Sequence, residues 1–504
     1  MKKIEADVVV IAGGMSGLSA AIAAAEKDAG VIVFEKGETT GGAGNMGMGL
    51  FAVGSHVQKE NMIDLTPDEA FGYFMEYTHW KGDARLIRKY YDLSGSTIEW
   101  LEHMGVEFLG AFKFFNQSFP TWHIIKVPGG GNLPSQRCAS VMVKAMTDYA
   151  NELGVEFHFG TPAKKILTEN GRVTGVLAVD PNGEEILAEC DAVVIATGGF
   201  GDNPEMFKEF TDHTWGEDLF SFRIPGLVGD GMKMAWEAGA ARSAISIEMT
   251  YNAPGISNFF RTLNEVMRQP NLLVNYQGKR IFNEQYMNNT VYTGNALDRQ
   301  FRRTGFTVID DSILEHYRKN GLDYVSWNQR LGNIDNWERE LEQFFSGEAA
   351  VTATSSLIQL DKAQTDSLFV ADSLEELAEK AGIDAANLVK TVEEYNAACV
   401  NGDRFFNKDP RFMRPLLGPR FYACKQCPAG YGSLGGILVD DDLKVQRADG
   451  TAIKGLYACG TDAACLFGDS YCFYMPGSTM GWAVNTGRMA GDNAIDYLDS
   501  EEYG

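Results

Sequence analysis

The sequence has few basic residues and no long apolar run. Forty-four lysines and arginines stand against 68 acidic residues, which gives a net charge of −24. A surface of that sign repels nucleic acid and anionic membranes. No segment approaches the roughly 18 apolar residues that cross a bilayer. The apolar run at residues 8–11 is too short for a signal peptide, because the glycine motif follows at once. We therefore expect a soluble, cytoplasmic protein with no nucleic-acid partner and no membrane span.

Cysteine motifs are also scarce. The eight cysteines are scattered along the chain, which is typical of reduced thiols in a large intracellular protein. Cys424 and Cys427 form a C-x-x-C in a segment that is predicted to be a strand, whereas a redox pair favours a helix N-terminus. No second pair or histidine follows at zinc spacing, and there is no C-x-x-C-H. The pattern predicts no metal site and no covalent c-type haem.

Glycine, in contrast, is abundant, with 55 residues in a chain of 504, a length that suits two domains. The first cluster, Gly13-Gly14-Met15-Ser16-Gly17, lies between a predicted strand over 4–12 and a predicted helix over 18–27. A second predicted strand, 31–34, ends at Glu35. Such glycines let a pyrophosphate approach the backbone at the helix N-terminus, and the acid accepts hydrogen bonds from a ribose 2′-OH. The pattern indicates a dinucleotide site.

The motif departs from G-x-G-x-x-G at its first glycine, where Ala12 stands. A methyl group is tolerated there if the φ angle of Ala12 stays negative. A second glycine-rich loop, residues 41–49, follows Glu35. It adds backbone donors for a long ligand, which an NAD site does not need, so the two loops together favour FAD.

Five later segments carry motifs of one known family. They are Asp191-Ala192-Val193-Val194-Ile195-Ala196-Thr197-Gly198-Gly199-Phe200-Gly201, Gly229-Asp230-Gly231 leading to Gly239-Ala240, Gly278-Lys279-Arg280-Ile281-Phe282-Asn283-Glu284, Gly455-Leu456-Tyr457-Ala458-Cys459-Gly460-Thr461-Asp462 and Pro476-Gly477-Ser478-Thr479-Met480-Gly481. With the first motif they resemble the flavoprotein family of fumarate reductase and succinate dehydrogenase. That family also includes 3-ketosteroid dehydrogenases, urocanate reductases and gut-bacterial alkene reductases.

The resemblance implies an α/β fold with two parts. A Rossmann-like FAD-binding domain is expected over 1–248 and 419–504, split in sequence by an inserted α+β capping domain over 249–418. Within the insert, the segment that starts at Ser373 is predicted to be a capped helix.

The resemblance also implies which residues bind FAD. The predicted cofactor-binding residues are Gly13, Gly14, Met15, Ser16, Gly17, Glu35, Lys36, Gly41, Gly42, Gly44, Asn45, Gly47, Gly49, Ala163, Thr197, Gly198, Gly199, Asp230, Gly460, Thr461, Asp462, Ser478, Thr479 and Met480. Related succinate dehydrogenases attach their flavin to a histidine after the double glycine, but no histidine precedes His56 here. Noncovalent FAD is therefore expected.

Alkene reduction in this family requires hydride from flavin N5, a proton donor and fixed groups that polarise the activating carbonyl. Residues 263–268 resemble the family's T-E-A-V-R segment, so Glu265 and Arg268 would share a helix face and pass a proton. The alternative is a plain surface salt bridge. The terminal arginine of fumarate reductases is replaced by Asn288, and Tyr286 is a candidate substitute donor, unless it is simply a core or surface tyrosine.

The clamp that holds dicarboxylates is also missing. Fumarate reductases have V-H-G-A-N-R where this chain has residues 466–471, so Phe467 replaces the histidine and Tyr471 the arginine. Residues 471–477 also resemble the Y-P-G-x-G turn of ketosteroid dehydrogenases, with Phe473 at the tyrosine position and Tyr474 beside it. The catalytic candidates are thus Glu265, Arg268, Tyr286 and Tyr471, and the substrate-binding candidates are His123, Tyr251, Asn288, Phe467, Asp469 and Tyr474.

Phenyl and phenol rings cannot neutralise a carboxylate, but they can hold a flat, uncharged ring. The leading hypothesis is an FAD-dependent reductase of a C=C or related activated position in a hydrophobic aromatic or polycyclic substrate. A flavonoid- or steroid-like molecule fits, tetrahydrodaidzein being one example. A ketosteroid-type dehydrogenase and a non-catalytic electron-transfer subunit are the alternatives. NAD(P)H, reduced flavin and a redox protein all stay open as the electron donor.

Overall fold

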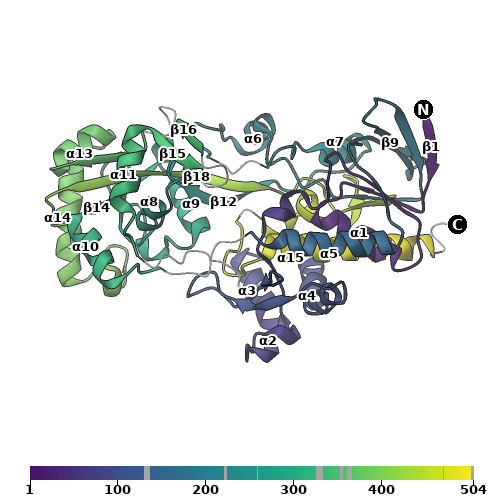
Figure 1. Cartoon of the computed structure of the whole chain (residues 1–504), viewed down its shortest axis with the longest axis horizontal. Helices are drawn as coiled ribbons and strands as arrows, with labels where there is room; N and C mark the ends of the chain where they lie inside the picture. The colour runs from purple at the N-terminus through teal and green to yellow at the C-terminus, as the bar shows by residue number, and fades with distance from the viewer. Residues whose placement is uncertain are drawn as a thin grey trace. The chain divides into compact units, whose positions relative to one another are not determined.

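The chain divides into two compact units in the computed structural model, which describes residues 1–129, 137–220, 224–257, 259–324, 333–351, 356–359, 366–468 and 470–500 (Figure 1). The first unit comprises Met1–Asp212, Arg223–Glu248 and Gly432–Gly504. The second comprises His213–Phe222 and Met249–Tyr431. The cap predicted from sequence covers 249–418, so the second unit contains that segment and two further stretches. We propose that the first unit binds FAD and that the second is the cap.

A large, mostly parallel sheet forms the centre of the first unit. Its strands are β1 Lys2–Glu5, β2 Val8–Ile11, β3 Val31–Phe34, β7 Glu156–His158, β8 Ala163–Glu169, β9 Arg172–Val179, β10 Glu185–Glu189, β11 Ala192–Ile195, β19 Lys444–Gln446 and β20 Ala452–Ala458. In the described residues they run in the order β1-β10-β9-β20-β11-β2-β3-β7, with β19 beside β20 and β8 beside β9. β20, β11, β2, β3 and β7 run parallel to one another, whereas β19 is antiparallel to β20. β2, β3 and β11 are continuous apolar runs and fully buried, as is typical of strands covered on both faces. This confirms the predicted α/β class.

Helices make up much of the rest of the first unit. They are α1 Met15–Ala25, α2 His56–Glu60, α3 Pro67–Tyr77, α4 Ala84–His103, α5 Ala139–Glu152, α6 Pro204–Thr211, α7 Asp230–Glu237 and α15 Ser478–Leu498. α1 and α15 lie side by side (Figure 1), and glycines allow their close approach. A Cβ on Gly487 would lie 2.2 Å from the Ser16 carbonyl oxygen, and one on Gly491 would lie 2.4 Å from that of Ala20.

A small antiparallel sheet also belongs to this unit. Its strands are β4 Gly49–Phe51, β5 Phe108–Phe112 and β6 Trp122–Ile125, in the order β4-β6-β5. β4 directly follows the second glycine loop, and the backbone N–H of Phe51 donates to Gly477 O (2.9 Å), just before α15 begins. The sheet therefore links the glycine loop to the start of α15.

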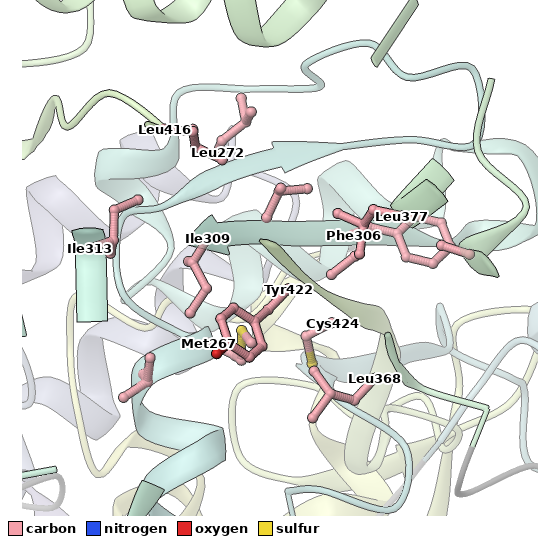
Figure 2. Close-up of a cluster of buried hydrophobic side chains, with 14 of the residues drawn as sticks. Met267, Leu272, Phe306, Ile309, Ile313, Leu368, Leu377, Leu416, Tyr422 and Cys424 are labelled. Atoms are coloured by element: carbon pink, nitrogen blue, oxygen red, sulfur yellow. The ribbon is translucent and has the colours of Figure 1, made fainter. Parts of the chain in front are cut away.

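The second unit has its own sheet and core. Its elements are β12 Ser246–Asn252, α8 Arg261–Met267, β13 Leu272–Val274, α9 Thr290–Asp298, β14 Gly305–Asp310, α10 Asp311–Asn320, α11 Trp337–Ser346, β15 Glu348–Val351, β16 Ser356–Gln359, β17 Leu368–Ala371, α13 Leu374–Ala381, α14 Ala385–Asn401 and β18 Phe421–Leu434. Residues 246–248 of β12 and 432–434 of β18 belong to the first unit. The main sheet runs β12-β18-β14-β13, with β17 beside β18. Figure 2 shows its buried cluster, in which Met267, Ile309 and Tyr422 lie together. Ser373 accepts a hydrogen bond from the N–H of Glu376, as the predicted cap of α13 requires.

Four charged side chains form a buried network in the second unit. Arg280 Nη2 lies 2.7 Å from Glu284 Oε2 and 3.0 Å from Asp403 Oδ2. Lys408 Nζ lies 3.3 Å from the same Glu284 oxygen. Because each charge faces an opposite one, the network can exist away from water, and it holds the segment 280–284 against residues 403–408.

The eight cysteines are all free. Cys424 and Cys427 are buried in β18, and burial raises the pKa of the Cys427 thiol to about 11. Among the described residues no group of histidine, cysteine and acidic side chains could hold a metal ion. No helix in that part of the chain is long and apolar enough to cross a bilayer.

Candidate FAD and active site

Three loops of the first unit leave the same edge of the parallel sheet. Residues 12–17 follow β2, residues 196–199 follow β11, and residues 459–462 follow β20. Since β20, β11 and β2 are adjacent and parallel, their carboxyl ends meet, which is where open α/β sheets bind ligands. Each of the three loops contains residues predicted to bind FAD.

The first loop is shaped by close backbone contacts. A Cβ on Gly17 would lie 1.9 Å from Ala12 O, so only glycine fits there. Ala12 has a φ of +82°, so the condition under which a methyl group costs little is not met. The loop needs the left-handed region at this position whichever residue occupies it, and a side chain costs about 1–2 kcal/mol there.

The N-terminus of α1 is built to receive an anion. Its N-cap is Gly14, no side chain caps it, and its first turn contains no acid. Among the described residues other than its two chain neighbours, one heavy atom lies within 4 Å of a Cβ added to Gly14, namely Ala196 O at 3.9 Å. The free N–H groups and the space at Gly14 fit a pyrophosphate.

Glu35 directly follows β3, beside this loop. Its Oε2 accepts from the N–H of Gly13 (2.7 Å) and its Oε1 from that of Gly37 (2.6 Å). Each carboxylate oxygen keeps a second lone pair that can accept from a ribose hydroxyl. The carbonyl of Glu35 accepts from the N–H of Thr161 (2.9 Å), which brings the segment before Ala163 to the same place.

The second glycine loop has φ of +94° at Gly41 and +46° at Gly42. Three further glycines in it allow close packing. An added Cβ would lie 2.8 Å from Met15 Cε at Gly44, 1.9 Å from Met480 Cε at Gly47 and 2.2 Å from His123 O at Gly49. Asn45 donates from Nδ2 to Thr40 O (3.1 Å). The loop is thus packed tightly between α1, α15 and β6.

Asp462 holds the second of the three loops in place. It is fully buried, and its Oδ2 and Oδ1 accept from the N–H groups of Gly198 (3.0 Å) and Gly199 (2.9 Å). The N–H and the hydroxyl of Thr197 donate to it as well. Asp462 therefore sets the conformation of the turn, and a direct contact of its side chain with FAD stays a prediction.

Other predicted FAD residues contact one another. Lys36 Nζ lies 2.7 Å from Asp230 Oδ2 at the start of α7. A Cβ on Gly460 would lie 2.6 Å from Ser16 Oγ, and the Ser478 hydroxyl donates to Met475 O (2.5 Å). Thr461 is half-buried next to Asp462. These contacts join the start of α1, the third loop and the start of α15, and together these parts fit a long dinucleotide.

The profile of the FAD binding domain family matches residues 7–472. The chain belongs to this family. A vinyl phenol reductase of Lactiplantibacillus plantarum is 30% identical over 98% of this chain and 97% of its own length. A fumarate reductase (cytochrome) of Shewanella frigidimarina is 26% identical over 97% of this chain and 77% of its own.

Among solved structures, the 3-ketosteroid-Δ4-(5α)-dehydrogenase of Rhodococcus jostii shares the fold, with a TM-score of 0.73 at 23% identity over 98% of this chain and 97% of that one. The flavoprotein is an FAD-dependent oxidoreductase that acts on CH–CH groups.

The predicted relay of the flavoprotein lies in its second unit. Glu265 is buried in α8, and Arg268 is the C-cap of the same helix. Arg268 Nη2 donates to Tyr251 O (2.6 Å), and its guanidinium lies 4.4 Å from the centre of the Tyr251 ring. Glu265 Oε2 and Arg268 Nε are buried without a hydrogen-bond partner among the described residues. Burial raises the pKa of Glu265 to about 7, although nearby Arg268 opposes the shift. This is not a plain surface salt bridge.

The other candidates of the second unit differ in exposure. Tyr251 is fully buried and donates to Met287 O (3.1 Å), and burial raises its pKa to about 12. Tyr286 is exposed on the short helix Glu284–Tyr286, and Asn288 is half-buried nearby. The structure thus gives Tyr251 a role in holding the loop at 287, whereas Tyr286 and Asn288 are accessible.

The aromatic candidates of the first unit belong to one cluster. The ring centres of Phe467 and Tyr471 lie 4.7 Å apart, and those of Tyr471 and Phe473 6.0 Å apart. We call the following residues the aromatic cluster: Tyr73, Tyr77, Phe115, Phe119, Phe467, Tyr471, Phe473 and Tyr474. Most of its rings are half-buried, and Tyr471 and Phe467 lie deepest.

Tyr73 and Tyr77 of the aromatic cluster were missed from the sequence. Tyr73 and Tyr77 lie on α3, with ring centres 5.8 Å and 6.1 Å from that of Tyr474. Their spacing on a helix places them on one face, but nothing local indicates that this face meets residues 471–474. Their signal, two tyrosines at i and i+4, is too common to single out a site.

Two other predictions have different outcomes. His123 is fully buried in β6, with Nε2 2.7 Å from Ser55 Oγ and Nδ1 3.0 Å from Thr121 O. Burial lowers its pKa to about 4, although the hydrogen bond to Thr121 opposes the shift. Both ring nitrogens have partners within the protein, which favours a structural role for His123. Asp469 lies outside the described residues.

Proposed function

We propose that the flavoprotein reduces the C=C bond of a neutral aromatic or polycyclic substrate, flavonoid- or steroid-like. The observation that supports this most is the aromatic cluster. Its members are phenylalanines and tyrosines, so the cluster itself supplies no cationic side chain. A dicarboxylate would need cations at this place, whereas a flat uncharged ring stacks on aromatic faces. The relative that reduces vinyl phenols supports the same substrate class.

The phenols of the cluster would orient the substrate. Burial raises the pKa of Tyr471 well above its ordinary value, with a further contribution from Glu248. Tyr471 therefore stays protonated at physiological pH and can donate a hydrogen bond to a carbonyl or phenol oxygen. Its oxygen accepts from the N–H of Thr479 (3.3 Å), which fixes the direction of the hydroxyl. A fixed donor of this kind stabilises charge that develops on an activating group.

Bound FAD supplies the hydride that goes to one carbon of the double bond. We assign delivery of the proton for the neighbouring carbon to Glu265 and Arg268. A buried carboxyl with a pKa near 7, such as that of Glu265, is protonated often enough to donate at neutral pH. Arg268 would give up one of its protons as it accepts the proton of Glu265. Tyr286 is the exposed candidate for the last transfer, and Asn288 would contact the substrate.

The substrate class is tested with chemically reduced enzyme under anaerobic conditions. Vinyl phenol, a flavonoid enone, a steroid enone and fumarate are mixed with it in turn, and reoxidation of the flavin is followed by its absorbance. We expect the neutral aromatic alkenes to reoxidise the flavin at least about tenfold faster than fumarate does. A faster reaction with fumarate would contradict the proposal.

A matched pair of variants assigns the selectivity to the cluster. Tyr474→Leu removes a half-buried ring that contacts three other members of the cluster, and Phe301→Leu removes an exposed ring of the second unit. Only Tyr474→Leu should lower kcat/KM for aromatic alkenes, by about tenfold or more. Equal effects of the two changes would exclude the cluster as the substrate site.

The reverse reaction, a ketosteroid-type dehydrogenation, is the second candidate. The resemblance of residues 471–477 to the Y-P-G-x-G turn favours it, with Tyr474 next to Phe473, which holds the tyrosine position. Saturated and unsaturated forms of one steroid ketone separate the two directions. Only a dehydrogenase would bleach oxidised FAD when the saturated ketone is added without another donor.

A further inference from the structure

One carboxyl of the first unit lies at the start of α15 without a cationic partner. Glu248, in β12, accepts from the hydroxyl of Thr479, with Oε1 and Oγ1 2.7 Å apart. The N–H of Thr479 donates to the hydroxyl oxygen of Tyr471. Among the described residues no ion pair involves Glu248. The carboxyl, the helix start and the phenol thus form one hydrogen-bonded group drawn from three separate segments.

The first turn of α15 contains no side chain that would cap its free N–H groups or place a negative charge beside them. Its N-cap is Gly477, which offers no side chain, and the turn contains no acidic residue. A helix of 21 residues ends in unsatisfied N–H groups that favour a negative charge. Glu248 supplies that charge from another strand, but only while it is ionised.

The charge of Glu248 changes close to neutral pH. Burial raises its pKa to about 7, and the hydrogen bond from Thr479 opposes the shift. Tyr471 is the titratable neighbour that interacts with it, and Tyr471 stays neutral because its own pKa is raised. Near neutral pH the carboxyl of Glu248 is therefore present in both its charged and its neutral form, and Tyr471 does not change its own charge in response.

This end of α15 also contacts the second glycine loop. Gly47 leaves room for Met480 Cε, and Gly477 O accepts from the N–H of Phe51, which follows the loop. Both the loop and residues 478–480 are predicted FAD contacts. A change of charge at Glu248 therefore occurs among the residues expected to surround the cofactor.

We propose that Glu248 is a positioning residue that takes up a proton when FAD is reduced, and so links the reduction potential of the flavin to pH. Reduction by two electrons adds negative charge, and a like charge disfavours an ionised carboxylate. The electrons come from the enzyme's reductant. The proton comes from solvent and adds to any that the flavin itself binds. Because linkage is reciprocal, a protonated Glu248 makes the flavin easier to reduce. The proposal depends on FAD binding by the first unit and not on the alkene.

The midpoint potential of bound FAD is measured against pH, from about 5.5 to about 8.5, a range that brackets the titration of Glu248. Dithionite serves as the reductant, and no alkene is needed. Below about pH 7 Glu248 is protonated in both redox states, so wild type and Glu248→Gln should have the same slope. Above it, wild type should take up one more proton per two electrons than Glu248→Gln. Glu237→Gln, an exposed change on α7, should behave as wild type.

Equal slopes for wild type and Glu248→Gln over the whole range would overturn the proposal. If Glu248→Gln does not retain FAD, the infrared difference spectrum of the wild type decides. A protonated carboxyl band should then appear on reduction at a pH above 7, and its absence would also overturn the proposal. Neither measurement uses the alkene, so failure here and failure of the substrate class are separate outcomes.

Discussion

At the scale of single residues, Glu265 carries the chemistry of the proposed relay. Its side chain is buried, and one of its oxygens has no hydrogen-bond partner among the described residues. Burial raises its pKa from 4.5 to about 7. Since the folded pKa is the higher one, the folded state binds the proton more tightly than the unfolded state does. Its contribution to stability is therefore complete below pH 4.5 and is lost as pH rises through 7.

Replacing Glu265 by glutamine should lower turnover of an aromatic alkene by about 100-fold or more, because the amide cannot supply a proton. It should also reduce the fall in Tm between about pH 5 and pH 8 that linkage predicts for the wild type. Steady-state kinetics and thermal melts at a series of pH values measure both effects. Glu237→Gln is the control, and a variant with wild-type turnover would rule out the relay.

At the scale of elements, the turn between β2 and α1 contains one glycine that serves helix packing and another that leaves space for the cofactor. Gly17 is in contact with the backbone at Ala12, whereas a Cβ on Gly14 has room. The two glycines stand three residues apart in one loop, but they serve different purposes. One allows the helix to approach the strand, and the other leaves space for a ligand.

Two alanine substitutions test this difference. Gly17→Ala should destabilise the apoprotein by about 1–3 kcal/mol, because the backbone must shift to admit the new atom. Gly14→Ala should leave apoprotein stability within about 0.5 kcal/mol and weaken FAD binding by about tenfold or more, because the methyl group enters the pyrophosphate space. Melts of the apoprotein and fluorescence titration with FAD measure the two quantities. Loss of stability without loss of FAD affinity in Gly14→Ala would refute the assignment.

The link between β20 and the loop after β11 is the second element-scale feature. Asp462 accepts hydrogen bonds from three consecutive N–H groups and one hydroxyl. In Asp462→Asn an NH₂ group would face these donors, so we expect a loss of about 3 kcal/mol in the free energy of unfolding. Chemical denaturation measures it, with the exposed Asp449→Asn as control. A loss no larger than that of the control would mean that the turn is held by other contacts.

At the scale of the whole molecule, the chain forms two units with separate cores. The second depends on the buried network around Glu284, whose carboxylate faces both Arg280 and Lys408. Removing that charge leaves buried cations without their partner, which is more costly than the loss of an exposed pair. Replacing Glu284 should therefore lower the stability of the second unit, and binding of FAD should raise the stability of the first unit.

Scanning calorimetry of wild type and Glu284→Gln, with and without FAD, tests this division. We expect Glu284→Gln to lower one transition, with a cost of about 3–5 kcal/mol, and added FAD to raise the other. Glu393→Gln, an exposed change on α14, should alter neither. A single transition that responds equally to the mutation and to FAD would show that the units do not unfold separately.

Much of the fold was readable from local sequence. The apolar run at 8–11, the glycines and Glu35 predicted the strand–helix–strand unit, because spacing along the backbone determines these features. The one predicted strand over 4–12 is in fact two, β1 and β2, interrupted where the Asp7 carboxylate accepts from the N–H of Gly30 (2.6 Å). Replacement of the dicarboxylate clamp by Phe467 and Tyr471 was also visible, because the residue types themselves show it.

The sequence by itself thus determined the family, the cofactor and the loss of the clamp. Only the tertiary structure decided the positive φ of Ala12, the use of Asp462 as a tether, and the meeting of α3 with residues 471–474. It also decided that Glu248 would bond to Thr479, which lies 231 positions away in the chain. Periodicity and spacing report on neighbours along the backbone. These contacts depend on how distant segments pack and which charges they bury, and no local pattern carries that information.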